Sequence, residues 1–98
     1  MKLAVVLRDV AESEFDEAFD WYDARRIGLG AEFAAEVQRT FDSLAANPRM
    51  HRITFADVRM AVVRRFYYCI YYRPHVDRIE VIAVFHPSRD PAIWQSRV

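Results

Sequence analysis

The sequence predicts a small α+β domain. It should consist of a short N-terminal strand, an antiparallel helical hairpin packed on a mostly antiparallel sheet of three further strands, and a short C-terminal helix. Apolar residues recur at helical spacing twice in the first half, and β-branched and aromatic runs dominate the second half. The 98 residues, 53% of them apolar and 29% charged, suit a single domain over residues 1–98 with one modest core.

A strand and a helix are predicted at the start of the chain. Residues 2–7 form a short apolar run that suits a strand. Asp9 and Glu12 then have the spacing of a capping box, in which the Asp side chain accepts a first-turn amide hydrogen and the Glu side chain reaches back. Apolar residues at helical spacing follow, so residues 10–26 should form an amphipathic helix with an acidic outer face.

A second helix is predicted after a short turn that contains Gly28 and Gly30. It should end at Asn47, because Pro48 follows. Its apolar side chains again recur at helical spacing, at Phe33, Ala34, Val37, Phe41, Leu44 and Ala45. Two consecutive helices joined by so short a turn are expected to pack as an antiparallel hairpin.

The second half of the chain reads as strands followed by one turn of helix. Runs rich in β-branched and aromatic residues predict three strands, at residues 57–64, 66–73 and 78–85. Only four residues separate the last two, which implies a hairpin. Asp90 before Pro91 has the pattern of an N-cap and a first helical residue, so a short final helix should carry Trp94.

Two arginines and four tyrosines occur as adjacent pairs along the middle strands. Side chains alternate between the faces of a strand, so Tyr67 and Tyr71 should lie opposite Tyr68 and Tyr72. One pair is expected to enter the core and the other to line a surface. The neighbours Arg64 and Arg65 should point apart in the same way.

Composition excludes several classes of protein. Cys69 is the only cysteine, which excludes an internal disulfide and a cysteine-rich zinc site. No apolar run approaches the roughly 20 residues that span a bilayer, and the start of the chain lacks a signal-peptide pattern. We therefore expect a cytoplasmic protein without membrane contact. No histidine spacing, glycine-rich loop or nucleophile triad points to a metal or a cofactor, and none is expected.

The formal net charge of zero conceals a division between the two halves of the chain. Residues 1–47 carry five Lys or Arg against ten Asp or Glu, whereas residues 48–98 carry nine against four. Either the basic half presents a cationic surface to an acidic partner, or an acidic helix pair and a basic sheet neutralise one another in the fold. The sequence leaves both interpretations open.

Several motifs occur in a characteristic order. They are AFDWY at 18–22, GLG at 28–30, NP at 47–48, VRMAVVRRFYYCIYY at 58–72, VIAVFH at 81–86 and RDPAIW at 89–94. No single motif is specific, but the ordered set resembles the RelE/ParE superfamily of type II toxins, small bacterial proteins encoded beside an antitoxin. The resemblance extends over almost the whole chain.

Within that superfamily the chain resembles the ParE-like branch more than the RelE-like branch. RelE-like members cut messenger RNA in the ribosome with basic residues that bind the scissile phosphate and a tyrosine near the C-terminus. Here no lysine follows residue 2, Tyr68 best matches an arginine position of those ribonucleases, and Trp94 falls near their tyrosine. Arg89 is the one catalytic-type residue that remains. A phosphoryl-transfer site needs such cations for its developing charge, so ribosome-dependent cleavage is not expected.

The resemblance to ParE-like toxins also indicates a function. It implies inhibition of DNA gyrase, neutralisation by a cognate antitoxin in a hetero-oligomer, and a role in plasmid stabilisation. Poisoning by binding requires no catalytic residue, and no direct sequence-specific nucleic-acid binding is expected. Two alternatives stay open: a RelE-like ribonuclease with a rearranged site that uses His86 and Arg89, and a degenerate, non-toxic member that only binds an antitoxin.

A target-binding surface is predicted at the cationic end of the sheet and the C-terminal segment. Its residues are Arg64, Arg65, Arg73, Arg89, Trp94 and Arg97. Arginines beside a tryptophan bind a protein or anionic surface through fork-like hydrogen bonds and stacking. In the alternative interpretation, Trp94 covers the core and Arg89 pairs with Asp90 or Glu80. His86 is the candidate acid–base group of the ribonuclease alternative, although a hydrogen-bonded structural role is favoured for it.

Overall fold

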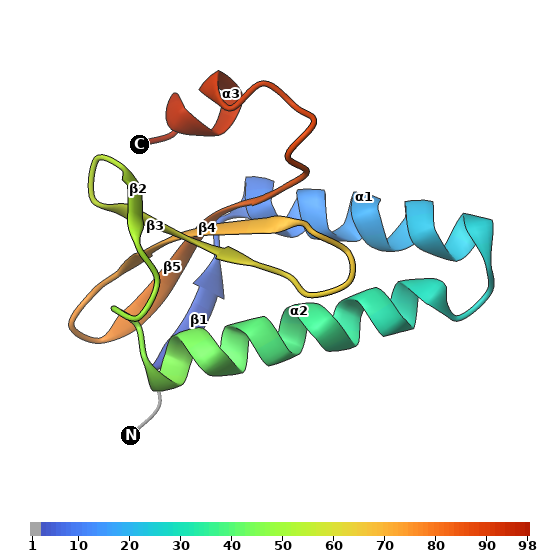
Figure 1. Ribbon diagram of the computed structural model, residues 1–98, viewed down its shortest axis with the longest axis horizontal. Helices are drawn as coiled ribbons and strands as arrows, with labels where there is room; N and C mark the ends of the chain where they lie inside the picture. The colour runs from blue at the N-terminus through green and yellow to red at the C-terminus, as the bar shows by residue number, and fades with distance from the viewer. Residues whose placement is uncertain (1–2) are drawn as a thin grey trace.

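The computed structural model describes residues 3–98 and confirms the predicted α+β fold. The elements in chain order are β1 (Ala4–Leu7), α1 (Asp9–Arg25), α2 (Leu29–Ala46), β2 (Ile53–Phe55), β3 (Val58–Val62), β4 (Cys69–Pro74), β5 (Arg78–Phe85) and α3 (Ala92–Gln95). Figure 1 shows α1 and α2 side by side as a hairpin, with the short α3 apart from them near the C-terminus. Residue 2, the expected start of the first strand, lies outside the described residues.

The sheet has five strands in the order β1-β5-β4-β3-β2. β1 pairs with β5 in parallel, and the other three pairings are antiparallel. This confirms the prediction of a mostly antiparallel sheet. The strand β2 adds to the three strands predicted for the second half. It is three residues long and exposed throughout, so it leaves no alternating apolar pattern by which a sequence reveals a strand.

The start of α1 differs from the expected capping box. The helix begins at Asp9, and the N-cap residue Arg8 makes no side-chain capping hydrogen bond. Arg8 still belongs to the sheet, since its amide donates to the carbonyl of Val81 at 3.0 Å. Asp9 and Glu12 therefore lie inside the first turn, where their negative charges favour the positive end of the helix dipole.

The connection between β3 and β4 also differs from the prediction. Residues 63–68 form a turn closed by hydrogen bonds from the Tyr67 amide to the Val63 carbonyl and from the Val63 amide to the Tyr68 carbonyl. Arg65 and Tyr67 have φ values of 72° and 61°, in the left-handed region that non-glycine residues rarely occupy. Residues 63–68 contain no glycine, so no turn was predicted here from the sequence. The expectation that Tyr67 shares a strand face with Tyr71 is therefore wrong.

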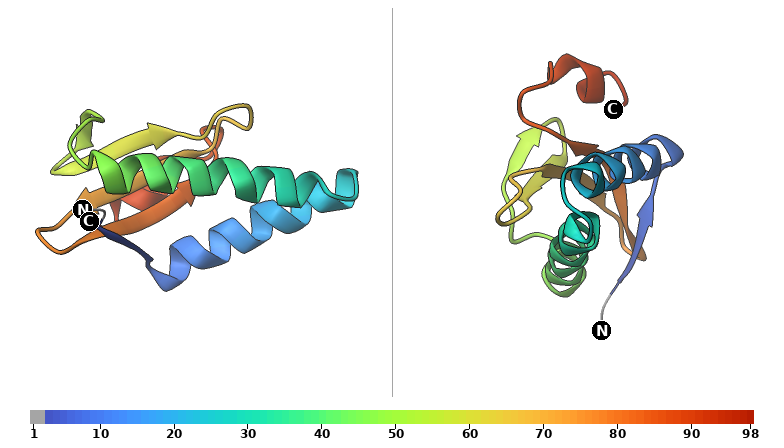
Figure 2. Two further views of the ribbon diagram at one scale, coloured as in Figure 1. Left: turned by 90° about the horizontal axis from the view of Figure 1, so that it is seen from below. Right: turned by 90° about the vertical axis from the view of Figure 1, so that its right-hand side faces the viewer.

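The sheet is covered on both faces. The helical hairpin packs on one face, around Phe33, Ile70 and Tyr72, while α3 covers the other through Tyr71 and Trp94. Figure 2 (right) shows α3 and α2 on opposite sides of the sheet. Because both faces are covered, both Tyr71 and Tyr72 are buried, and the expectation that one tyrosine pair would line a surface is wrong.

A β-bulge in β5 decides which residues reach the helical hairpin. Tyr72 pairs with Val81 and Tyr71 pairs with Ala83, so Ile82 is an extra residue on β5. Before the bulge, Val81 packs on the hairpin face, whereas after it Phe85 packs on the α3 face. The bulge thus reverses the alternation just before the strand ends, and the next residue, His86, lies beside Tyr68 on the hairpin side.

Replacing Gly30 with alanine tests the packing of the helical hairpin. A Cβ atom at this position would lie 2.8 Å from the Phe19 carbonyl oxygen and 3.0 Å from its ring. We expect Gly30→Ala to lower the free energy of unfolding by about 1–3 kcal/mol through overpacking. Helix propensity alone would raise it by about 1 kcal/mol. Urea denaturation followed by circular dichroism gives the sign, and an increase in stability would contradict the close packing.

Candidate functional site

A cleft of about 430 Å³ lies between α1 and the carboxyl end of β5. Three aromatic side chains, a histidine, an arginine and two carboxylates line it together with smaller residues: Glu14, Glu17, Ala18, Trp21, Tyr22, Tyr68, Val84, His86, Ser88 and Arg89. It brings together His86 and Arg89 of the predicted site residues, and it adds Trp21, which is half-exposed. Burial raises the pKa of the Tyr68 and Tyr22 phenols above the ordinary value, so these groups are even less able to act as phenolates at physiological pH.

The buried carboxylate of Glu14 organises the inner wall of this cleft. Only 8% of Glu14 is exposed, and it is the one charged residue buried among residues 3–98. Its two oxygens accept hydrogen bonds from Arg97 at 2.9 and 3.0 Å and from Arg89 at 3.2 Å. A buried carboxylate requires such partners, because removing an unpaired charge from water costs on the order of several kcal/mol.

Beyond the point where β1 ends, side chains supply the hydrogen-bond partners of the β5 backbone. The Val84 amide donates to Glu14 Oε1 at 3.1 Å, and Arg97 donates to the Ile82 carbonyl at 3.3 Å. Both backbone groups lie past Val81, the last β5 residue that pairs with β1. Glu14 and Arg97 thus take the place of a longer β1, because buried backbone groups need partners.

Arg89 is the cation that the cleft leaves partly free. Its side chain is 44% exposed, pairs with Glu14, and stacks with its guanidinium 4.5 Å from the centre of the Phe85 ring. The alternative partners considered from the sequence, Asp90 and Glu80, are not the ones it uses. Asp90 instead accepts a hydrogen bond from the Ala92 amide at 3.0 Å. The N-cap of α3 is Pro91, so the expectation that Asp90 is the N-cap and Pro91 the first helical residue is wrong by one position.

His86 is held by its neighbours. Its Nδ1 accepts a hydrogen bond from the Ser88 amide at 3.1 Å and lies 2.6 Å from the Ser88 hydroxyl. The imidazole also meets the Tyr68 ring edge-on, with 5.2 Å between ring centres. A histidine whose Nδ1 accepts an amide hydrogen carries its proton on Nε2 when neutral, so these contacts fix its tautomer. They match the structural role that the sequence favoured.

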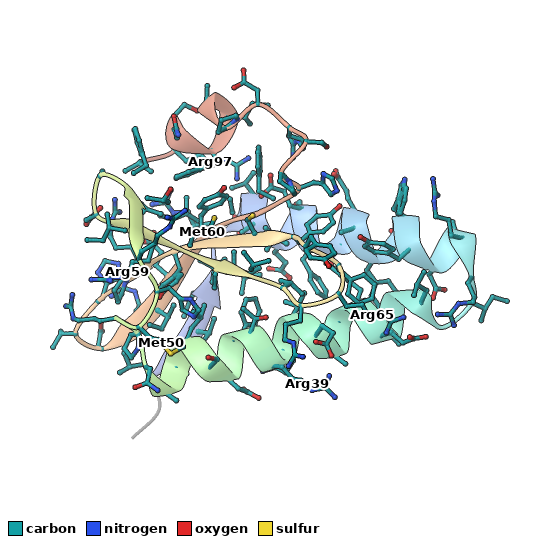
Figure 3. The ribbon with its side chains drawn as sticks, in the orientation of Figure 1. Arg39, Met50, Arg59, Met60, Arg65 and Arg97 are labelled. Atoms are coloured by element: carbon teal, nitrogen blue, oxygen red, sulfur yellow. The ribbon has the colours of Figure 1, made fainter. Side chains whose placement is uncertain are left out.

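The remaining predicted residues do not join this cleft. Arg73 binds Asp57 at 2.9 Å at the far end of β4, and Arg65 binds Glu32 at 2.7 Å beside the hairpin. Figure 3 shows Arg65 next to α2 and Arg97 beneath α3, well separated in the fold. The expected single cationic surface is therefore divided among three places. Hydrogen bonds from these arginines lower the pKa of the Asp57 and Glu32 carboxyls.

Trp94 is a core residue. It is 1% exposed, and its ring stacks on Tyr71 with 3.9 Å between the centres. The expectation that this ring faces a target is wrong, because α3 must turn it inward to cover the second face of the sheet. The interpretation of Trp94 as a cover for the core is the one that its burial supports.

Sequence reasoning missed Glu14, although a signal was present. Ala11, Glu14 and Ala18 follow one another at helical spacing and are the three buried residues of α1. A carboxylate in an apolar stripe is unusual, since Glu is almost never fully buried unless it is paired. Its partner Arg97 lies 83 positions away in sequence, so the pairing itself could not be read from spacing.

Residues 3–98 contain no group of three or more His, Cys, Asp or Glu side chains placed to hold a metal ion. No helix over the same residues combines the length and the apolar character that crossing a membrane demands.

Comparison with known proteins supplies the family. The model for the ParE toxin of type II toxin-antitoxin system, parDE, matches residues 5–91. No curated protein matches the chain. A solved structure from the chromosomal ParDE TA system of P. aeruginosa is similar, with a TM-score of 0.75 and 15% sequence identity. The likeness covers 87% of this chain and 96% of that chain, and at this identity it shows the fold alone.

Removing the charge of Glu14 tests its structural role. Glu14→Gln keeps the shape of the side chain but leaves the half-buried Arg97 without its carboxylate. We expect the free energy of unfolding to fall by about 2–4 kcal/mol. Asp16→Asn, two residues away on the exposed side of α1, is the control and should change stability by less than about 0.5 kcal/mol. Equal effects of the two variants in urea denaturation would show that the carboxylate is not essential.

Proposed function

This chain belongs to the ParE toxin family of type II toxin–antitoxin systems, and from that premise we propose that it inhibits DNA gyrase and is neutralised by a cognate antitoxin. The observation that carries the proposal is the family match over residues 5–91, nearly the whole described fold. The cleft beside α1 is the part of the fold that we assign to target binding.

The chemistry of the cleft supports inhibition by binding rather than by catalysis. Arg89 pairs with Glu14, His86 is hydrogen-bonded to Ser88, and Tyr68 is a neutral phenol whose pKa burial raises above the ordinary value. Cleavage of RNA needs a proton acceptor in line with a 2′-hydroxyl and cations for the developing charge. The cleft offers one partly free cation, already shared with a carboxylate.

Arg89 is the residue of the cleft that we propose to contact the target. Its guanidinium is half-exposed and held from below by Glu14 and Phe85, so little conformational entropy remains to be lost when it binds. Trp21 forms the opposite wall with an exposed indole. Arg97 and Trp94 act from beneath, by fixing the C-terminal segment that carries Arg89.

Arg89→Gln should separate target binding from stability. We expect the variant to remain folded, to bind the antitoxin, and to inhibit gyrase supercoiling at least about ten-fold less well, as for the loss of one interface hot spot. Arg78→Gln removes an exposed arginine at the start of β5 and is the control that should inhibit like the natural chain. An Arg89→Gln variant with full inhibition would remove Arg89 from the target surface.

The target itself is tested in cells and in vitro together. Controlled expression should induce the DNA-damage response, and purified protein should block supercoiling without cutting RNA on ribosomes. Specific cuts in the ribosomal A site, mapped by primer extension, would refute gyrase inhibition and favour the ribonuclease alternative.

The antitoxin is proposed to bind at the opposite side of α1, where a groove of about 560 Å³ opens between β1 and the helical hairpin. Apolar side chains of Val5, Leu7, Phe15 and Phe41 line it. β1 is an edge strand that pairs only with β5, so its outer backbone groups are open to an added strand. An extended or amphipathic antitoxin segment fits such an edge beside an apolar groove.

A charge placed on the edge strand that borders this groove should disrupt the complex. Val6→Arg puts a guanidinium on the exposed outer side of β1, and we expect antitoxin affinity to fall at least about ten-fold while gyrase inhibition persists. Val76→Arg, at a 98% exposed position in the β4–β5 loop, is the matched control. Co-purification at moderate salt reports the result, and an intact complex with Val6→Arg would place the antitoxin elsewhere.

A further inference from the structure

Four arginines and two exposed aromatic side chains belong to the end of α1, the α1–α2 turn and the turn of residues 63–68, and ion pairs hold these two turns together. We call this set the arginine–aromatic patch: Trp21, Arg25, Arg26, Arg64, Arg65 and Tyr67. Ion pairs join its two turns, because Glu32 binds Arg26 at 2.9 Å and Arg65 at 2.7 Å. Beneath the patch, the Tyr22 and Phe66 rings pack with centres 4.9 Å apart.

The second turn holds its side chains in fixed directions. Phe66 is buried, and the left-handed conformations of Arg65 and Tyr67 on either side of it turn the backbone sharply. Tyr67 is consequently 68% exposed, the most exposed tyrosine or tryptophan among the described residues. Backbone conformations that non-glycine residues avoid are concentrated at functional sites in proteins, where the direction of a side chain matters more than the strain.

The aromatic surface on α1 is also preorganised. The guanidinium of Arg25 lies 3.3 Å above the centre of the Trp21 ring, and Tyr22 meets the same indole edge-on. The stacked pair presents a flat, cationic face to solvent.

We propose that the arginine–aromatic patch binds a single strand of nucleic acid, with phosphates on the guanidiniums and bases stacked on Tyr67 and the Trp21–Arg25 pair. Proteins that bind single strands without sequence preference combine these two elements. An acidic peptide would satisfy the arginines but not the aromatic faces, and a duplex hides its base faces inside the stack. The acidic outer side of α1, with Glu17 and Asp20, limits the contact to a few nucleotides at this end.

This inference rests on the proposed function for the source of the strand, which is DNA opened by a topoisomerase. The binding itself needs no topoisomerase, so the two can fail separately. A chain that binds oligonucleotides but leaves supercoiling unaffected would refute the proposed function and keep the patch. A chain that inhibits supercoiling but binds no oligonucleotide would refute nucleic-acid binding by the patch and leave the proposed function intact.

The test is fluorescence anisotropy with a labelled oligothymidylate of fifteen nucleotides and the full purified chain. The four arginines of the patch, together with the Glu32 carboxylate that pairs with two of them, carry a net charge of +3. We expect affinity to fall about 20-fold between 50 and 200 mM salt, from the dependence of single-strand binding on the phosphates neutralised. Arg64→Gln should reduce the salt dependence by about a third. The control Arg78→Gln, at the other end of β4 and β5, should not.

Stacking is tested by a pair of substitutions at one position. Tyr67→Ala should weaken binding at least about five-fold, whereas Tyr67→Phe, which keeps the ring, should bind like the natural chain. An oligouridylate should bind equally, because the proposed contacts use only bases and phosphates. Absence of binding at 50 mM salt, tighter binding to a duplex or to a poly-glutamate peptide, or equal binding by the two Tyr67 variants would overturn the proposal.

Discussion

The carboxylate of Glu14 is the constraint on which the other features of this fold depend. It lies on the buried side of α1 and accepts hydrogen bonds from the sheet, through the Val84 amide, and from the C-terminal segment, through Arg97. Three parts of the chain that share no continuous secondary structure are thereby fixed to one another. A hydrophobic residue at position 14 could fill the same space but could not pair the Val84 amide or position Arg89 and Arg97, so the charge is retained despite its desolvation cost.

The bulge at Ile82 and the double cover of the sheet work together with this carboxylate. Because the bulge reverses the alternation of β5, Phe85 can join Trp94 and Tyr71 under α3 while His86 faces α1. The chain then turns back over Phe85, whose ring lies beneath Arg89. A regular β5 would exchange these two faces. The cleft therefore depends on one extra residue in a buried strand as much as on the residues that line it.

Most of the fold was predictable because local patterns determine it. The stripes of α1 and α2, the glycine turn and the hairpin of β4 and β5 each follow from a few neighbouring residues. The candidate site was harder to predict from the sequence. Arg89 and His86 could be named from their motifs, but the inward position of Trp94 depends on α3 covering a second sheet face. The pairing of Glu14 with Arg97 depends on tertiary contacts between distant segments. Where the chain makes a tight turn without glycine, as at residues 63–68, strand propensity gave the wrong boundary.

The contacts of Arg97 also have a consequence for synthesis of the protein. Its guanidinium binds Glu14 and its carbonyl accepts a hydrogen bond from Arg8, so residues near the two ends of the chain meet. β1 likewise finds its only strand partner some seventy positions later. On the ribosome these partners are absent until β5 and the segment that carries Arg97 have left the exit tunnel, because a chain emerges from its N-terminus onward. The cleft is therefore among the last parts of this domain to form, whereas the groove residues of the helical hairpin leave the ribosome earlier, when a partner can already bind them.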